Sequence, residues 1–444
     1  MATLTIKNVG PIKEVLDLKL NKVNVFMGPQ SSGKSTIAKI ISHCAWIEKD
    51  ASINEDLDGY DDFEESLEKF HKMKGYFKGN SFISYQSDVI EILYEEKKFS
   101  IKWANKDIYK RCKIAYIPSE RNIVVMQEME KVELPKTNIR SFLFDWFDAR
   151  KTHPKKNKIL GLGIQYYYNE NKKEDRVLSS KKNDKYDILL SHASSGLQST
   201  IPLVVMLEYL SNWIYHNEEN ESYQGKEQRD NRKKRFFLEA TFEFINNSNL
   251  GEDIDSLKDF LDKIISAKDA NSILSEDNTF SPQEIKLINS VLEYSIKDRN
   301  LFKTHFSNFI IEEPEQNLFP STQRDLVYHL LKLITGERDH QLTITTHSPY
   351  VLYALNNCMM AGLVHEKMSE ADKEKLKCLS SKIDPKSVSI YEIEDGKFKE
   401  NKTKDGEVNK TIQRENGLIS NNYFDQKMKE LMDDFYVMLN YYGK

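Results

Sequence analysis

A short run near the start of the chain has the residue types and the spacing of a phosphate-binding loop. The run from Gly28 to Ser35 matches the pattern G-x-x-x-x-G-K-[ST], with an apolar stretch before it and helical spacing after it. Its glycines allow backbone N–H groups to wrap around phosphates, and the start of the following helix adds its positive dipole end. Lys34 is therefore expected to reach the β- and γ-phosphates of ATP, and the Ser35 hydroxyl to bind Mg²⁺. The residues expected to contact the nucleotide here are Gly28, Pro29, Gln30, Ser31, Ser32, Gly33, Lys34, Ser35 and Thr36. A chance glycine-serine turn is the alternative, and the flanking patterns argue against it.

Two adjacent carboxylates follow a second apolar stretch. Glu312 and Glu313 come directly after residues 309–311, Phe-Ile-Ile, which are typical of a buried strand. One acid at a strand end can hold Mg²⁺, and a second can polarise an attacking water as a general base. We expect Glu312 to bind the metal together with Ser35, and Glu313 to be the catalytic base. A surface acidic turn is the alternative, and the phosphate-binding pattern upstream disfavours it.

A third motif has the properties of an anion contact. Ser194, Ser195, Gly196 and Gln198 open an apolar stretch of helical character that runs to Leu210, and the unpaired N–H groups of such a helix start can bind an anion. Plain capping by one of the two serines is the alternative.

His347 follows an apolar stretch at residues 342–345, a place where ligands bind if the strands are parallel. A lone histidine is usually structural. Its position after the carboxylate-bearing strand instead favours a catalytic role, with a hydrogen bond donated to the γ-phosphate.

The composition narrows the class of protein. The chain is 39% hydrophobic and 30% charged with a net charge of -5, so a globally basic nucleic-acid binder is excluded. Local basic segments at 151–158 and 232–235 leave nucleic-acid binding possible, although solvated loops are the simpler interpretation. We find no apolar run long enough to span a membrane and no pattern of a signal peptide. The four cysteines are far apart in the sequence, which disfavours a zinc site or disulfides, and we expect a cytoplasmic protein.

The order of the chemical motifs divides the chain into parts. Residues 1–210 contain the phosphate-binding loop and the serine-glycine motif, and residues 303–444 contain the two glutamates, His347 and a tail. Between them, residues 211–302 change in composition and are expected to form a helical insertion. The signals for helices there are an apolar stripe from Leu257 to Ile265 and a capping box that begins at Ser281. Strands are expected within 80–117 and 388–393, and an amphipathic helix within 424–439.

Taken together, the motifs resemble those of ABC ATPases in the order Walker A, signature, Walker B and H-loop. Lys34 and Glu312 are 278 positions apart (312 − 34), which is expected when an insertion splits an ABC head. The resemblance is closest to the branch that contains SMC proteins, RecF-like proteins and overcoming-lysogenization-defect (OLD) ATPases. The runs 6–13, 116–121 and 312–318 look like those of stand-alone bacterial ATPases of this group, many of which belong to phage-defence systems such as Septu, PARIS and retron-linked modules. The resemblance implies an α/β ABC-ATPase head, a P-loop NTPase with a mixed sheet flanked by helices.

The resemblance also implies partners. ATP bound at Lys34 of one copy would meet Ser195 and Gly196 of a second copy, so that ATP and Mg²⁺ support a head-to-head homodimer or a higher homo-oligomer. The function implied is the sensor or scaffold of an antiphage complex that acts with a separate effector, such as a Toprim or HNH nuclease. A DNA-repair ATPase of the SMC or RecF type that clamps nucleic acid is the alternative. A one-chain OLD nuclease is disfavoured because no Asp-x-Asp pair follows His347.

Two positions depart from the usual ABC pattern, and one motif of that pattern is not assigned. Glu312 stands where the Walker B acid is usually Asp, and Phe319 stands where many ABC proteins have the Asp of the D-loop. The Q-loop glutamine is not assigned. The candidates are Gln86 and Gln127, or a replacement by Ser119, Glu120 or Arg121.

Overall fold

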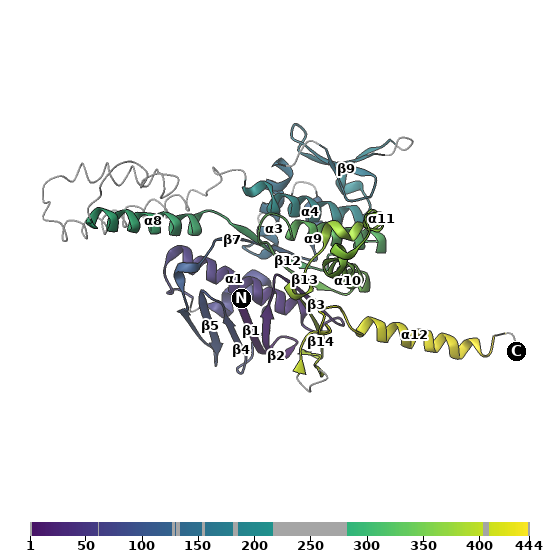
Figure 1. The fold of residues 1–444 in the computed structure, drawn as a ribbon, viewed down its shortest axis with the longest axis horizontal. Helices are drawn as coiled ribbons and strands as arrows, with labels where there is room; N and C mark the ends of the chain where they lie inside the picture. The colour runs from purple at the N-terminus through teal and green to yellow at the C-terminus, as the bar shows by residue number, and fades with distance from the viewer. Residues whose placement is uncertain are drawn as a thin grey trace.

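The computed structural model describes residues 2–60, 62–126, 129, 134–152, 156–180, 185–215, 282–402 and 408–442. Its centre is an eleven-stranded sheet with the strand order β6-β5-β4-β1-β2-β15-β14-β3-β13-β12-β7 (Figure 1). The parallel part contains β14 (Val388–Glu394), β3 (Val23–Met27), β13 (Gln341–Thr346), β12 (Phe306–Glu312) and β7 (Cys112–Ile117). The rest contains β6 (Lys98–Trp103), β5 (Ile90–Glu95), β4 (Phe82–Gln86), β1 (Ala2–Val9), β2 (Ile12–Leu20) and β15 (Lys397–Phe398). β15 joins the two parts, because it is parallel to β2 and antiparallel to β14.

The strand β3 is buried on both faces, as expected for a central parallel strand. Val25 pairs with Ile344 of β13 on one side and with Ile390 of β14 on the other. Because side chains alternate along a strand, Val25 belongs to one hydrophobic core and Phe26 to a second core on the opposite face. β3 therefore contributes to both hydrophobic cores directly before the phosphate-binding loop.

Helices cover both faces of the sheet (Figure 1). The first core contains residues of α3 (Asn138–Thr152), α4 (Ser195–Ser211), α9 (Pro320–Ile334) and α10 (Pro349–Val364). The second contains residues of α1 (Lys34–Asn54), α2 (Phe63–His71) and the end of α8 (Pro282–Phe302). Within the described residues the other helices are α11 (Glu370–Lys373) and α12 (Tyr423–Leu439), and α12 projects from the body in Figure 1. Short 3₁₀ turns are η1 (Lys106–Ile108), η2 (Arg121–Val125), η4 (Leu190–His192), η5 (Trp213–Tyr215), η6 (His365–Lys367), η7 (Lys377–Ser381) and η8 (Pro385–Ser387).

A second, four-stranded sheet lies beside the helical layer and was not predicted from the sequence (Figure 1). Its strands are β8 (Asn157–Lys158), β9 (Ile164–Asn169), β10 (Glu174–Ser179) and β11 (Asp187–Leu189). They are short and carry several charged residues, so their alternation of apolar and polar residues is weak. A small hairpin is formed by β16 (Asn401–Lys402) and β17 (Val408–Asn409).

The fold expected from the sequence, an α/β P-loop NTPase with a mixed sheet flanked by helices, is confirmed. The strands expected within 80–117 are β4 to β7, and the expected C-terminal helix is α12. The helix start expected near Ser281 is confirmed by α8, which begins at Pro282. Ser281 itself, the stripe from Leu257 to Ile265 and the basic segment 232–235 lie outside the described residues. In the part of the chain that is described, no helix is both long and apolar enough to cross a membrane.

Candidate nucleotide site

The carboxyl ends of the parallel strands bring the predicted site residues to one edge of the sheet. The phosphate-binding loop follows β3, His347 follows the neighbouring β13, and Glu312 ends β12. The strands end at nearly the same level, because Met27 pairs with Thr346 and Glu312 pairs with Thr345. Ligands of open α/β sheets bind at this edge. The order of strands thus gathers motifs that are distant in the sequence.

The phosphate-binding loop is held in a conformation that requires its glycines. Gly28 has φ 143° and Gly33 has φ 108°, both in the region that favours glycine. A Cβ at Gly28 would collide with the carbonyl oxygen of Ile393, and one at Gly33 with the side chain of Ile12. Gly33 precedes α1 without a side-chain cap, so the first N–H groups of α1 have no side-chain acceptor. This arrangement suits an anion.

Lys34 is a buried cation surrounded by the oxygens of its own loop. Its Nζ donates to Gly28 O at 3.0 Å, to Pro29 O at 2.6 Å and to Ser32 Oγ at 3.3 Å. Burial lowers the pKa of Lys34 to about 8, although the charges of Glu313 and Glu315 act in the opposite direction. The charged form of Lys34 is therefore destabilised in this loop, and a bound phosphate would stabilise it.

Glu312 is almost fully buried and its carboxylate is oriented by two donors. Tyr116 Oη donates to Glu312 Oε1 at 2.6 Å, and the Ser119 N–H lies 3.5 Å from Glu312 Oε2. Both donors follow from the pairing of β7 with β12, in which Ile310 is opposite Tyr116. The carboxylate is thus fixed at the strand end, which a metal ligand requires.

Glu313 and His347 face each other across the site. Glu313 Oε1 is 3.5 Å from His347 Nε2, and both side chains are partly exposed. Glu313 has φ 44°, a conformation rarely adopted by residues other than glycine, and its N–H donates to Thr345 O at 2.9 Å. Burial lowers the pKa of His347, as does the charge of Lys34, so the imidazole is neutral at neutral pH. The predicted base and the predicted γ-phosphate donor are therefore adjacent.

Glu315 fixes the two loops relative to each other. Its Oε1 accepts a hydrogen bond from the His347 N–H at 2.6 Å, which ties the loop after β12 to the loop after β13. Burial raises the pKa of the Glu315 carboxyl group. Because this carboxylate is buried and bound to backbone, the more exposed Glu313 is the better candidate for a base.

Arg121 has a larger role than the sequence indicated. Its guanidinium is fully buried and donates from Nη1 to Glu312 O at 3.0 Å and from Nη2 to Glu313 O at 2.8 Å. Its Nε donates to Ser199 O of α4 at 3.3 Å. Burial lowers the pKa of Arg121 only to about 10, so it stays charged at neutral pH. Arg121 therefore connects the loop that carries Glu313 with the helix that carries the serine-glycine motif.

The Q-loop candidates that the structure describes lie at different positions along the sheet from the phosphate-binding loop. Gln86 ends β4 in the antiparallel part of the sheet, and β14, β15, β2 and β1 lie between β4 and β3 in the strand order. Gln127 lies outside the described residues. Of the proposed replacements, Ser119 and Arg121 contact the glutamates at the end of β12, as described above. Ser119 Oγ also donates to Glu120 Oε2 at 3.1 Å.

The serine-glycine motif opens α4 at the surface. Ser194 and Ser195 are exposed, and the helix has no side-chain cap. Gln198 instead uses its amide within the chain, because Nε2 donates to Ser191 O at 2.9 Å and to Ala193 O at 3.0 Å. A Cβ at Gly196 would approach Asn317 O at 2.8 Å, so the helix start packs closely on the loop after β12. Among the described residues, no hydrogen bond or ion pair joins 194–198 to the phosphate-binding loop 28–36.

The donor set at this edge fits a nucleoside triphosphate with a divalent cation. The start of α1 and Lys34 offer N–H donors and a positive charge, while Ser35 and Glu312 are a hydroxyl and an oriented carboxylate. Ser35 and Glu312 would hold Mg²⁺, which neutralises charge on the β- and γ-phosphate oxygens when bound.

Comparisons with solved structures give low similarity over long alignments. The SMC head domain from Thermotoga maritima is 10% identical with a TM-score of 0.33, over 79% of this chain and 90% of that one. The recombination mediator protein RecF is 11% identical with a TM-score of 0.27, over 89% and 96%. An ABC-transporter ATP-binding cassette in its ADP conformation is 12% identical with a TM-score of 0.25, over the full length of both chains. No curated protein matches the chain in sequence.

A family model gives the assignment. The model described as an AAA ATPase domain matches residues 1–352. This range contains the phosphate-binding loop, the serine-glycine motif, both glutamates of the acid pair and His347. The chain therefore belongs to the AAA ATPase domain family and is a P-loop ATPase.

Proposed function

We propose that this ATPase binds ATP and Mg²⁺ between two copies of the chain and hydrolyses the ATP slowly, so that the nucleotide controls head-to-head dimerisation. The observation that carries the proposal is the separation of two anion-binding helix starts within one chain. Lys34 begins α1 at the sheet edge, whereas Ser195 begins α4 at the exposed surface without a hydrogen bond or ion pair to the described loop 28–36. A second copy can supply the missing helix start.

The residues of one copy then have distinct roles. Lys34 and the N–H groups at the start of α1 bind the phosphates, and His347 donates a hydrogen bond to the γ-phosphate. Glu313 accepts a proton from the attacking water. Ser194, Ser195 and Gly196 of the second copy contribute donors to the γ-phosphate, while Gln198 orders the loop before them through Ser191 O and Ala193 O.

The coupling between ATP and dimerisation follows from differential affinity. ATP contacts both copies only in the closed dimer, so ATP favours that state. Hydrolysis removes the γ-phosphate and with it the contact to the second copy. Within each copy Arg121 links elements of the two composite sites, because it binds Glu313 O of one site and Ser199 O of α4, the helix that serves the other site.

We further propose that the chain is the sensor or scaffold of an antiphage complex with a separate effector nuclease. The runs 116–121 and 312–318 support this through their resemblance to stand-alone defence ATPases. In this proposal the head consists of 1–210 and 303–444, and the insertion 211–302 is the region that binds the effector. If the protein instead clamps DNA as a repair ATPase, duplex DNA will stimulate its ATPase activity several-fold.

Head-to-head dimerisation is tested by light scattering on purified Glu313→Gln with and without ATP and Mg²⁺. Every protein in this test also carries Phe435→Glu in the exposed helix α12, which removes the nucleotide-independent contact proposed in the next subsection. We expect ATP to convert this variant into a dimer, because the γ-phosphate persists. Lys34→Ala should stay unchanged by ATP, because the main cation for the phosphates is lost. An unchanged mass of Glu313→Gln at saturating ATP would overturn the proposal, provided that calorimetry confirms ATP binding.

A further inference from the structure

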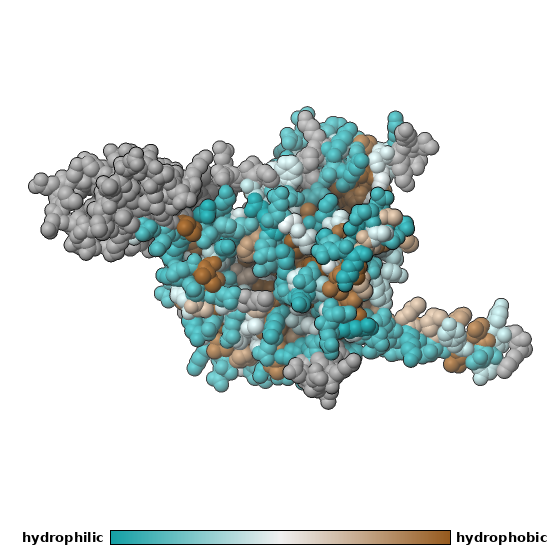
Figure 2. Space-filling view, viewed as in Figure 1, coloured by the Kyte–Doolittle hydropathy of each residue, from teal (hydrophilic) through white to brown (hydrophobic). Residues whose placement is uncertain are grey.

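The C-terminal helix α12 forms an exposed arm with an apolar seam. Met428, Leu431, Phe435 and Met438 follow one another at spacings of three, four and three residues, the spacing of helices that pack on a partner. Leu431 is 66% exposed, Phe435 51% and Met438 63%, and no α12 side chain is buried. Figure 2 shows hydrophobic residues along this projecting helix. Such a seam is costly in water unless another surface covers it.

The base of the arm is fixed to the body. Asn422 caps α12 through a capping box with Asp425, and the Tyr423 N–H donates to Glu392 Oε2 at 3.2 Å. Tyr353 Oη of α10 donates to Asp425 Oδ1 at 2.7 Å. Because Glu392 and Asn422 are almost fully buried, these bonds set the direction in which the arm leaves the body. Figure 1 shows that this direction leads away from α9 and α10.

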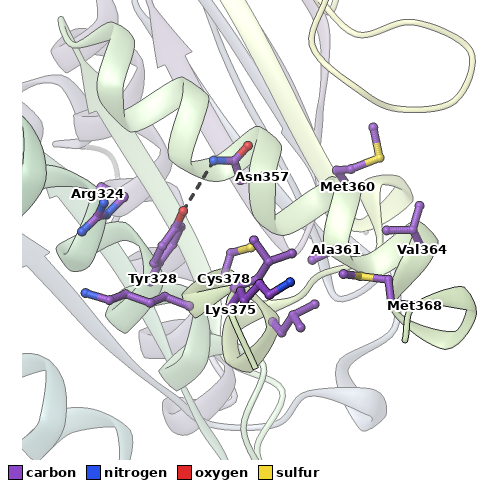
Figure 3. Close-up of a pocket in the computed structure, with 12 residues that line it drawn as sticks. Arg324, Tyr328, Asn357, Met360, Ala361, Val364, Met368, Lys375 and Cys378 are labelled. Carbon is purple, nitrogen blue, oxygen red and sulfur yellow. Dashed lines mark hydrogen bonds between the residues drawn. The ribbon is translucent and has the colours of Figure 1, made fainter. Parts of the chain in front are cut away.

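A groove of about 510 Å³ lies elsewhere on the same chain, between α9, α10 and η7. Figure 3 shows Arg324 and Tyr328 at one end and Met360, Val364 and Met368 at the other. The methionines offer flexible apolar contacts of the kind enriched at interfaces. Lys377 contributes positive charge to its rim, whereas Arg324 is paired with Asp325 at 2.8 Å and Lys375 with Asp372 at 3.0 Å.

We propose that the arm of one copy docks in this groove of a second copy, with the seam on the methionines and the acidic edge of the arm beside Lys377. Between residues 431 and 442 the arm has two acidic residues, Asp433 and Asp434, and no basic one. Asp434 precedes Phe435 and so lies beside the seam, about 100° around the helix. Lys377 of the groove and the acidic distal arm are opposite in charge, and both surfaces are apolar at their centre.

The occupant of the groove is a second copy for two reasons. The fixed base directs the arm away from its own groove, and one chain carries both complementary surfaces, which is the condition for a reciprocal exchange between identical subunits. A membrane surface is disfavoured, because the arm lacks the basic face of interfacial helices. Lys427 is moreover paired with Glu430 at 2.7 Å. This association requires no nucleotide and is thus distinct from the ATP-dependent dimer.

The test uses the full chain with Lys34→Ala in every variant and without nucleotide, so that failure of the ATP-dependent dimer does not affect the result. Light scattering at several protein concentrations should give a dimer for the parent chain. Phe435→Glu should give a monomer, because the charge falls in the seam. Tyr436→Glu is the matched control, one residue further and off the seam, and should still dimerise.

Charge reversal then identifies the groove. Asp433→Lys with Asp434→Lys on the arm, or Lys375→Glu with Lys377→Glu in the groove, should each give monomers. A mixture of the two should recover a heterodimer, since each arm then meets a groove of opposite charge. A monomeric parent chain would overturn the proposal. So would a groove variant that still dimerises, because the arm would then pair with another surface.

Discussion

The Arg121 guanidinium donates a hydrogen bond to the carbonyl oxygen of Glu313 at 2.8 Å, and its Nε reaches Ser199 O at 3.3 Å. A single buried cation thus contacts the loop of the proposed base and the first turns of α4. In the proposed dimer, these two elements serve two different nucleotides. Arg121 is therefore a positioning residue that connects the composite sites.

Arg121→Lys should lower kcat by roughly 10²-fold with a small change in ATP affinity, because the lysine cannot bind both carbonyl groups and the base shifts. The unsatisfied carbonyls should also lower the free energy of unfolding by about 1–3 kcal/mol. Steady-state kinetics and thermal unfolding measure both effects. Arg140→Lys on α3 is the control and should change neither. Equal losses in kcat and in ATP affinity would indicate a general disruption instead of lost positioning.

Glu313→Gln should lower kcat by about 10²–10⁴-fold while ATP still binds, since an amide cannot accept a proton from water. Glu315→Gln is the matched comparison. Its amide oxygen can still accept the His347 N–H, so its kcat should fall less. The measurement is single-turnover hydrolysis at saturating ATP. A larger loss in Glu315→Gln than in Glu313→Gln would transfer the role of base to Glu315.

ATP binding should take up a proton at alkaline pH. The pKa of Lys34 is about 8 in the free protein, and bound phosphates raise it. Below about pH 7 Lys34 is charged in both states and affinity is independent of this group. Above pH 8 the free lysine loses its proton, so affinity falls as pH rises, by at most about tenfold per pH unit. Calorimetry at pH 9 in two buffers of different ionisation enthalpy measures the uptake.

The matched control for this pH dependence is Lys34→Arg, because arginine stays protonated throughout the range. This variant should show no proton uptake at pH 9 even if it binds ATP more weakly. Uptake that is equal in the two proteins, or absent in the parent chain, would contradict the assignment to Lys34.

The sequence predicted the positions of most candidate site residues, because each of them follows a strongly apolar strand. Lys34, Glu312 and His347 could be placed at one sheet edge once their strands were taken as parallel. The position of Glu313 followed from the same strand, because it is the residue after Glu312.

The contacts of Arg121, Tyr116 and Glu315 could not be predicted, because they depend on how β7, β12 and β13 pair in space. Gln198 was expected to contact the nucleotide, and the structure places its amide on Ser191 O and Ala193 O. The small sheet β8–β11 was missed because its strands alternate weakly between apolar and polar residues.

The central claim, that each ATP is bound by Lys34 of one copy and Ser195 of another, is tested most directly by mixing two inactive variants. Lys34→Ala lacks the phosphate lysine in both sites of its dimer, and Ser195→Arg blocks the second helix start in both. A mixed dimer contains one intact site, formed by Lys34 of one variant and Ser195 of the other. Each variant alone should have little ATPase activity, and an equal mixture should regain up to about a quarter of the parental rate if dimers form at random. A mixture no more active than its parts, or full activity of Ser195→Arg alone, would contradict the account.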